Sequence, residues 1–227
     1  MGLFSWLSRM FEPERVTVRD LIWQTVAAKL QGAGREVNQC ITSGRSVLLL
    51  AHFPSTLAAF GEELTSRELT LAAIPDHLTS AAALKLGAAE SAPRVLFGLT
   101  RQLRSDEFPP PAEAPPSPLA VLVLERHFLR AHDESITQFA AGLGSRVEVV
   151  FHSSLEDSLM RLFAGEWVLN VLRQLGMKED EVIESGLVAR RLASAQAKVA
   201  ADVAKGGEER PADSPEEWLA VNFPQEE

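Results

Sequence analysis

The sequence lacks most of the features that would assign it a chemistry at once. It has one cysteine among 227 residues, Cys40, which excludes a disulfide scaffold and a cysteine-based zinc site and is typical of a buried structural thiol. No apolar run approaches the roughly 18 residues of a membrane-spanning helix, and the longest, from Leu119 to Leu124, has the length of a strand. The net charge of −9 argues against a general nucleic-acid-binding protein. A globular protein with an apolar core remains.

Motifs for phosphate binding and nucleophilic catalysis are absent as well. The sequence contains no G-x-x-x-x-G-K-[ST], no G-x-G-x-x-G after an apolar run and no G-x-S-x-G. His127, His132 and His152, with the carboxylates of Asp133 and Glu134 nearby, could in principle bind a metal. None of these histidine pairs has the i, i+3 or i, i+4 spacing of a helical metal site. We therefore expect hydrogen-bonded or solvated histidines and no metal.

The middle of the chain alternates between apolar runs and helix-compatible segments. Runs that are apolar on both faces, separated by helices of about 10 residues, predict an α/β fold with a mostly parallel sheet covered on both sides. A helix is expected to begin at Thr17, with others at 55–64 and 79–89, and the chain after the last run is expected to be helical at 155–163, 166–175 and 185–205. The expected strands are 47–51, 69–74, 94–99, 119–124 and 146–151.

A parallel sheet places ligand sites at the carboxyl ends of its strands. The side chains that follow the five runs are therefore the first candidates for a site. They are His52, Pro75, Thr100, Glu125 and His152.

Three segments stand outside a predicted domain of residues 17–165, and one proline-rich loop interrupts it. Residues 1–15 form an amphipathic stripe, which suits a helix packed on protein or a weak peripheral membrane contact through Leu3, Phe4, Trp6 and Leu7. Residues 108–118 hold six of the thirteen prolines and predict an extended surface loop. Residues 166–205 form a helical extension. Residues 206–227 carry seven acidic groups and one basic group, and predict a disordered acidic tail.

Two of these segments offer an interaction surface. The helix predicted at 185–205 carries an apolar stripe that must fold back on its own sheet, dimerise or receive a partner helix, because leaving it in water is unfavourable. The tail adds aromatic residues that could form a short docking motif. The predicted surface is Leu187, Leu192 and Val199 from the helix, with Trp218 and Phe223 from the tail.

Several strings in the sequence resemble one family. Residues 154–163 read SLEDSLMRLF and residues 172–185 read LRQLGMKEDEVIES, followed by LVARR at 187–191 and AQAKV at 195–199. Upstream, DLIWQT at 20–25, GRSVLL at 44–49 and ERH at 125–127 fit the same family. Together they resemble the second RecA-like domain of SecA, the motor ATPase of bacterial preprotein translocation, and the start of its helical scaffold. The resemblance covers about residues 17–203 and implies a three-layer α/β/α fold of the P-loop NTPase type.

The chain departs from this family where the family handles phosphate. In SecA the motif Q-x-x-G-R-x-x-R directs two arginines at the nucleotide. An ungapped alignment places Phe139 and Gly142 at the arginines, and Ser135 and Gln138 at the Gln and Gly. The family's Gly-Arg-Gly-Thr-Asp element is reduced to LRSD at 103–106. Fixed positive charge at a transferring phosphoryl group is worth about 10³–10⁵ in rate, so we expect no enzyme activity. The polar groups left for a vestigial nucleotide site are Asp106, Glu125, Arg126 and Arg130.

The resemblance thus implies a cytoplasmic, non-catalytic SecA-like protein that acts through protein contacts linked to protein export, with or without a peripheral membrane contact. Its expected partners are proteins of the translocation machinery and not nucleic acid. No cofactor is expected, and ATP only with a partner. Two alternatives stay open: a subunit that completes an ATP site in trans, and a binding module unrelated to secretion on a reused fold. The oligomeric state is open too.

Overall fold

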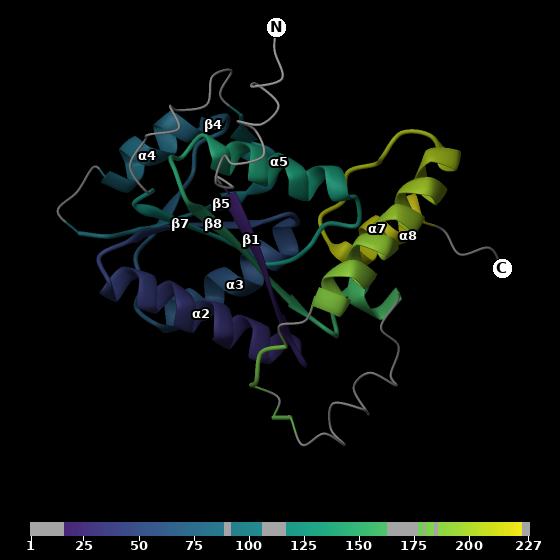
Figure 1. Ribbon diagram of the computed structural model, residues 1–227, viewed down its shortest axis with the longest axis horizontal. Coiled ribbons are helices and arrows are strands. Elements are labelled where there is room, and N and C mark those ends of the chain that lie inside the picture. The colour runs from purple at the N-terminus through teal and green to yellow at the C-terminus, as the bar shows by residue number, and fades with distance from the viewer. Residues whose placement is uncertain are drawn as a thin grey trace, which may run out of the picture.

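A single six-stranded parallel sheet with helices on both faces organises the chain (Figure 1). The computed structural model describes residues 16–88, 92–105, 117–162, 177–178, 180–183 and 186–223. The strand order is β1-β8-β7-β2-β5-β3, and a second, two-stranded sheet pairs β4 with β6. The strands are β1 (Val16–Trp23), β2 (Ser46–Ala51), β3 (Leu71–Ala73), β4 (Leu78–Thr79), β5 (Val95–Leu99), β6 (Leu103–Arg104), β7 (Leu119–Val123) and β8 (Val147–Ser154). The helices are α2 (Val26–Thr42), α3 (Pro54–Ser66), α4 (Ser80–Ala88), α5 (Arg130–Ala141), α7 (Gly186–Gly206) and α8 (Pro215–Asn222).

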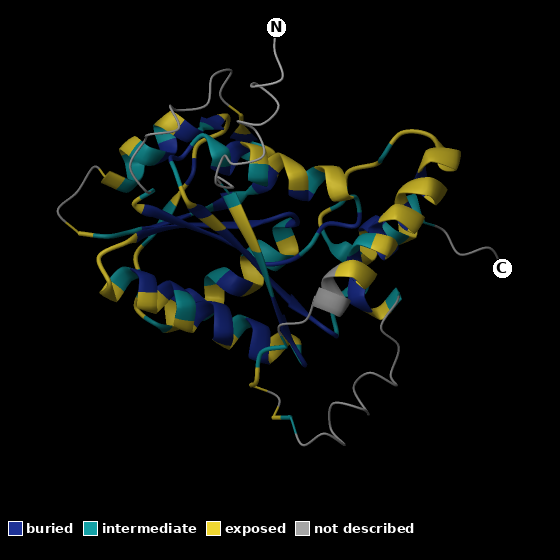
Figure 2. Ribbon diagram, in the orientation of Figure 1, coloured by how far each residue is buried: buried dark blue, intermediate teal, exposed yellow. Residues whose placement is uncertain are grey.

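The sheet is buried on both faces, as its apolar runs predict. In β2 the side chains of Leu48 and Leu50 join a cluster with α4 and α5, while those of Val47, Leu49 and Ala51 join a second cluster with α2 and α3. Figure 2 shows the central strands as a dark blue layer between helices with exposed outer faces, while the edge strand β1 is exposed over part of its length. The expected α/β fold class and the five expected strands are confirmed, because β2, β3, β5, β7 and β8 coincide with the five runs.

The helix predicted to begin at Thr17 is wrong. Residues 16–23 form the edge strand β1, which pairs in parallel with β8 from Val16 opposite Val147 to Trp23 opposite Ser154. The spacing of the apolar residues there is compatible with the period of a helix and with that of a strand. Eight residues of backbone pairing with β8 stabilise the strand. The helix begins later, at Val26, where the Thr25 hydroxyl accepts the Ala28 N–H at 3.1 Å and caps it.

The tail predicted to be disordered is ordered as far as Phe223. Ser214 caps α8 by accepting the Glu217 N–H, and Pro215 stands at the first helical turn. Trp218 is 1% exposed. The acidic composition pointed to disorder, but the apolar residues of this segment find a hydrophobic surface to cover, which compensates the entropy of ordering it.

The apolar stripe of α7 folds back on its own chain. Leu192, Val199 and Trp218 are buried in a third cluster at the carboxyl end of the sheet, with Ile22, Phe53 and Phe128. Of the three outcomes expected for the stripe, folding back on the chain's own sheet is the one observed, and Leu192, Val199 and Trp218 are core residues here instead of an exposed surface. Phe223 is half-buried against the same cluster, and the side chain of Leu187 lies outside the described part of the chain.

Several predictions fall on residues that the structure does not describe. These are the segment 1–15 with its proposed membrane contact, most of the proline-rich loop 108–118, the helix at 166–175, and Asp106. Among the helices that are described, none is both long enough and apolar enough to cross a membrane.

Candidate functional site

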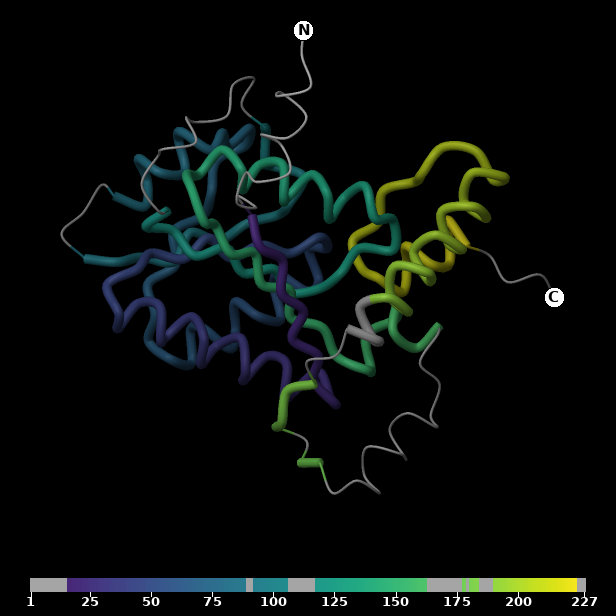
Figure 3. The backbone as a smooth tube through the Cα atoms, viewed as in Figure 1, coloured from purple at the N-terminus to yellow at the C-terminus, as the bar shows by residue number. Residues whose placement is uncertain are grey.

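Three of the five side chains selected after the strands meet at the carboxyl edge of the sheet. His52 follows β2, Thr100 follows β5 and Glu125 follows β7, and hydrogen bonds link all three positions. Pro75 is exposed, and His152 lies within β8 instead of after it. The chain then returns past this edge, where α7 and α8 lie side by side (Figures 1 and 3).

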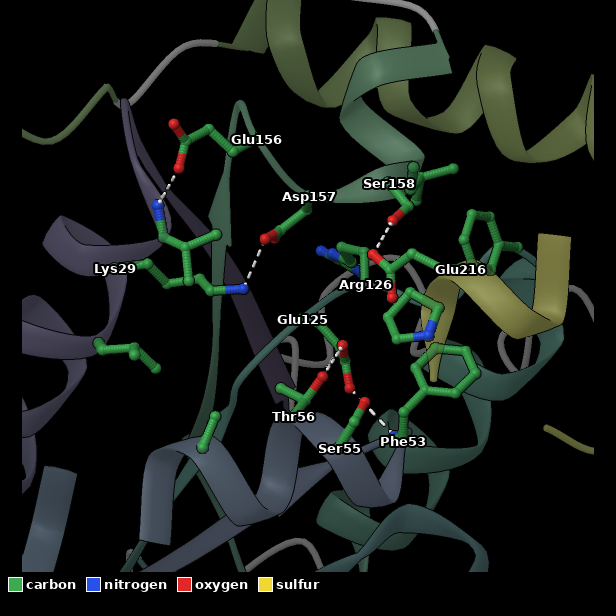
Figure 4. Close-up of a pocket in the computed structure, with 16 residues that line it drawn as sticks. Lys29, Phe53, Ser55, Thr56, Glu125, Arg126, Glu156, Asp157, Ser158 and Glu216 are labelled. Atoms are coloured by element: carbon green, nitrogen blue, oxygen red, sulfur yellow. Dashed lines mark hydrogen bonds and ion pairs between the residues drawn. The ribbon is translucent and has the colours of Figure 1, made fainter. Parts of the chain in front are cut away.

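Glu125 occupies the N-terminus of α3. One carboxylate oxygen accepts the backbone N–H groups of His52 and Phe53 at 3.0 and 3.1 Å, and the other accepts the Thr56 hydroxyl at 2.6 Å (Figure 4). Phe53 is the N-cap of α3 and offers no side-chain acceptor, so Glu125 satisfies donors that the helix leaves unpaired. A helix N-terminus after a strand is where an anionic ligand would bind in such a sheet. An internal carboxylate fills that place here.

Burial raises the pKa of Glu125, against the opposing effects of the Lys29 charge, the His52 charge and the Thr56 hydrogen bond. Three donors nevertheless point at its two oxygens. The group therefore acts as an acceptor for the helix end.

A cavity of about 200 Å³ opens beside Glu125. Lys29 within it is bound to Asp157, with 2.6 Å between Nζ and Oδ1. Asp157 also accepts the Ser154 N–H and hydroxyl at 2.8 Å, and Glu156 accepts the Val26 N–H (Figure 4). The charged residues that line the cavity are four acidic, Glu125, Glu156, Asp157 and Glu216, and two basic, Lys29 and Arg126.

Arg126 is held on three sides. Its Nε and Nη2 atoms lie 2.8 and 2.7 Å from Asp20 Oδ1, and its Nη1 lies 3.4 Å from Asp133 Oδ2. Its guanidinium also lies over the Phe151 ring, 3.5 Å from the centroid. Both cations of the cavity are thus already paired with carboxylates, and neither is free to bind a phosphate.

A second line of polar groups runs from β5 to α7. The Thr100 hydroxyl lies 3.0 Å from His52 Nδ1, and His52 Nε2 lies 2.9 Å from Asp133 Oδ1. Asp133 also accepts the His127 N–H at 3.0 Å and the Gln196 side-chain amide at 2.7 Å. Burial acts to raise the pKa of Asp133, but the His52 hydrogen bond and charge, with Arg126, hold it below its usual value.

The order hydroxyl, imidazole, carboxylate is that of a nucleophilic triad. Here all three groups are buried, at 8% exposure or less. Their hydrogen bonds connect the ends of β2 and β5 to α5 and α7.

His127, His132 and Glu209 bring three metal-ligating groups within 4.8 Å of one another. The His127 Nδ1 atom accepts the Leu129 N–H at 3.0 Å, so the neutral ring carries its proton on Nε2. That protonated nitrogen faces Glu209 at 3.6 Å. Burial, and then the charges of His52 and His132, hold the pKa of His127 well below its usual value. A cation would need the nitrogen that bears the proton, and a metal-bound histidine normally donates from its other nitrogen. The cluster does not suit a metal.

A comparison with known families falls on this part of the chain. A family model described as the SecA P-loop domain matches residues 114–180. The protein translocase subunits SecA of Xanthomonas campestris pv. campestris (strain B100) and Xanthomonas oryzae pv. oryzae (strain PXO99A) are each 45% identical over 83 residues. Those residues are 37% of this chain and 9% of each relative, so the chain spans a small part of their length. The resemblance to SecA is confirmed.

Among solved structures, the C-terminal part of the Fun30 ATPase domain aligns with 75% of this chain and 54% of its own. The TM-score is 0.42 and the identity 11%. The assignment of the fold rests on the sheet topology itself.

The stretch related to SecA contributes Glu125, Arg126, Asp133 and Asp157 to the site. Of the predicted vestigial nucleotide residues, Glu125 and Arg126 line the same cavity. Arg130 does not line that cavity: its side chain is 65% exposed, pairs with Glu134 and shares with Arg126 a second cavity beside β1.

The two positions that the ungapped alignment is expected to place at the SecA motif arginines lie in the packed part of the fold. Phe139 is fully buried in α5 against the sheet. Gly142 follows α5, and a Cβ placed on it would lie 2.4 Å from the Ser80 hydroxyl oxygen. A longer side chain at this position would collide with Ser80, the first residue of α4, so the close approach of α4 to the end of α5 depends on a glycine here.

Sequence reasoning missed Lys29, Thr56 and Gln196. Thr56 lies in the first turn of α3, and this position at a helix N-terminus is the signal in the sequence that could have identified it as a site residue. Lys29 and Gln196 act on partners 128 and 63 residues away, Asp157 and Asp133, and the local sequence around either one does not indicate the pairing.

Proposed function

We propose that this protein is a non-catalytic, SecA-related domain that acts through protein contacts in protein export. The observation that carries the proposal is the position of Glu125. Its carboxylate takes the hydrogen bonds at the N-terminus of α3 that an anionic ligand would need. A nucleotide phosphate would have to displace a buried acidic group from three donors.

The charge around this position supports the same proposal. The adjoining cavity has four carboxylates against two cations. Lys29 and Arg126 are engaged by Asp157, Asp20 and Asp133. A triphosphate entering the cavity would meet an excess of negative charge with no free cation among the described lining residues, and catalysis of phosphoryl transfer depends on such cations.

The link to protein export rests on the relation of residues 114–180 to SecA. We propose that the protein works in the cytoplasm without a cofactor, and that its partners belong to the translocation machinery. The pairing of Arg126 with Asp20 and Asp133 argues against the alternative of an ATP site completed in trans, since this arginine would first have to leave both carboxylates.

Calorimetric titration of the full chain with MgATP and MgADP tests the proposal. We expect no heat of binding at millimolar nucleotide and no release of phosphate. The same titration on material co-purified with its partner proteins tests the trans alternative. Binding by the isolated chain that is lost on substitution Arg126→Gln would show that the site is functional and the proposal wrong.

A further inference from the structure

The carboxyl edge of the sheet is covered by a segment of the chain itself, residues 208–223, which we call the C-terminal segment. Its Trp218 ring stacks on the Phe128 ring with centroids 4.5 Å apart and planes 5° from parallel. The same indole meets the His127 ring edge-on at 5.5 Å. This single side chain fills the apolar surface beneath the segment and is its main hydrophobic anchor.

Polar contacts surround this anchor. The Asp213 carbonyl accepts the Ser55 N–H at 3.0 Å, and Glu216 accepts the Ser158 hydroxyl at 2.6 Å (Figure 4). Ser55 lies in the first turn of α3, and Ser158 follows β8 by four residues. Glu209 accepts from the Trp218 indole N–H at 2.8 Å and pairs with His132 at the same distance.

Two acidic groups of the segment have partners on its docking surface. Residues 208–223 contain five acidic groups and one basic group. The Ser158 hydroxyl bonds Glu216 and the His132 ring bonds Glu209, and these contacts help to hold the pKa of each carboxyl below its usual value. An aromatic anchor in a pocket with polar contacts at its rim is the arrangement of a peptide-recognition site.

An exposed pair of glycines joins the segment to α7. Gly206 is the last residue of α7, Gly207 follows it with a φ of +108°, and nothing lies within 4 Å of where a Cβ would sit on either residue. Beneath the segment a cavity of about 240 Å³ remains, lined in part by His52, Thr100 and Arg101. A diglycine tether lets the segment leave and return without strain in the rest of the fold.

We propose that this edge of the sheet is a peptide-binding site, which the C-terminal segment occupies in cis and an acidic, tryptophan-bearing peptide of a partner protein occupies in trans. The partner presents one tryptophan to Phe128 and His127, with carboxylates placed for Ser158 and His132. This inference deepens the proposed contact role by naming its surface. Its test does not involve nucleotide, so the two can fail separately.

The test uses the full chain with a protease recognition sequence inserted between Gly206 and Gly207. The protein folds before it is cut, so docking is complete at the moment of cleavage. The probe is a fluorescent synthetic peptide of residues 208–223, followed by anisotropy. The control peptide carries Trp218→Ala, and the control protein is the same insertion left uncut.

After cleavage and dilution, we expect the labelled peptide to exchange into the site. The uncut protein should bind it about 100-fold more weakly or worse, because a tethered competitor acts at millimolar effective concentration. The Trp218→Ala peptide should not bind. If the cut protein releases its segment and still fails to bind the labelled peptide, or binds both peptides equally, the site does not exist as described. Concentration-dependent dimerisation of the uncut chain that blocks the peptide would assign the surface to a second copy and overturn the partner assignment.

Discussion

Glu125 illustrates how a single buried acidic residue can replace a ligand. Its oxygens accept two backbone N–H groups and one hydroxyl at the start of α3, while burial raises its pKa. Its role in folding therefore depends on its acceptor atoms more than on its charge. A glutamine has the same shape and can present its carbonyl oxygen to both N–H groups, while its amide donates to Thr56.

We therefore predict different outcomes for two substitutions at this residue. Glu125→Gln should change the free energy of unfolding by less than about 1 kcal/mol, whereas Glu125→Ala should lower it by about 3 kcal/mol, because two buried N–H groups lose their acceptor. Urea unfolding at neutral pH measures both, with Glu62→Ala on the exposed face of the same helix as control. Equal losses for the glutamine and alanine variants would show that the charge itself is required.

A dependence of stability on pH follows from two buried histidines. Burial holds the pKa values of His127 and His152 below their ordinary value of 6.5. The unfolded chain therefore binds protons on these residues before the folded protein does. Stability is complete above about pH 6.5 and falls as the pH decreases, by up to about 1.4 kcal/mol per pH unit for each histidine. The raised pKa of Glu125 opposes this fall at lower pH.

Urea unfolding at several pH values between about 7.5 and 5.5 checks this dependence, because that range of about 2 pH units spans the usual pKa of histidine. His127→Gln should make the slope shallower, whatever it does to the stability at pH 7.5. The exposed His77 serves as the matched control, and His77→Asn should leave the slope unchanged. If both variants change the slope of stability against pH equally, the buried ring of His127 is not the cause of the pH dependence.

At the scale of single elements, α2 shows how tight packing can require residues that have a low helix propensity. It carries two buried glycines, Gly32 and Gly34. A Cβ on Gly32 would lie 2.1 Å from the Trp23 ring, and one on Gly34 would lie 2.7 Å from the Arg67 Nε atom. Trp23 is buried at the end of β1, whereas Arg67 is a long, partly exposed side chain that pairs with the partly exposed Glu63.

We expect Gly32→Ala to lower the melting temperature and Gly34→Ala to keep it or raise it slightly. Alanine is a better helix former than glycine by about 0.5–1 kcal/mol, and only at Gly34 can the neighbour move to accept the methyl group. Thermal unfolding followed by circular dichroism compares the pair, and each variant is the control of the other. Stabilisation by both would mean that Trp23 does not hold its place against α2.

The elements differ in how far the sequence predicts them. The central strands are readable because burial on both faces requires a continuous apolar run, as in Val47 to Ala51 and Leu119 to Val123. The edge strand β1 is not, since its residues alternate weakly and its pairing partner β8 lies about 130 residues later in the sequence. In the site, sheet topology predicts that His52, Thr100 and Glu125 meet. Long-range pairs such as Lys29 with Asp157 leave no local pattern.

At the scale of the whole molecule, the third hydrophobic cluster joins the sheet to α7 and α8. Ile22, Phe53 and Phe128 come from the carboxyl edge of the sheet, while Val199 and Trp218 come from the last part of the chain. The acidic composition of residues 206–227 predicted that they are dispensable. The burial of Trp218 in this cluster reverses that expectation, because removing it would expose the aromatic rings beneath it.

A chain that ends at Lys205 should therefore be less stable than the full chain. Loss of a buried tryptophan typically lowers the free energy of unfolding by about 3–5 kcal/mol, which corresponds to a fall of about 10 °C in melting temperature for a protein of this size. A chain that ends at Phe223 is the matched control and keeps every contact described above, so its melting temperature should equal that of the full chain. Thermal unfolding followed by circular dichroism compares the three proteins. An unchanged melting temperature for the shorter chain would mean that the sheet and α7 form a complete folding unit without α8, and that the C-terminal segment contributes nothing to the stability of the fold.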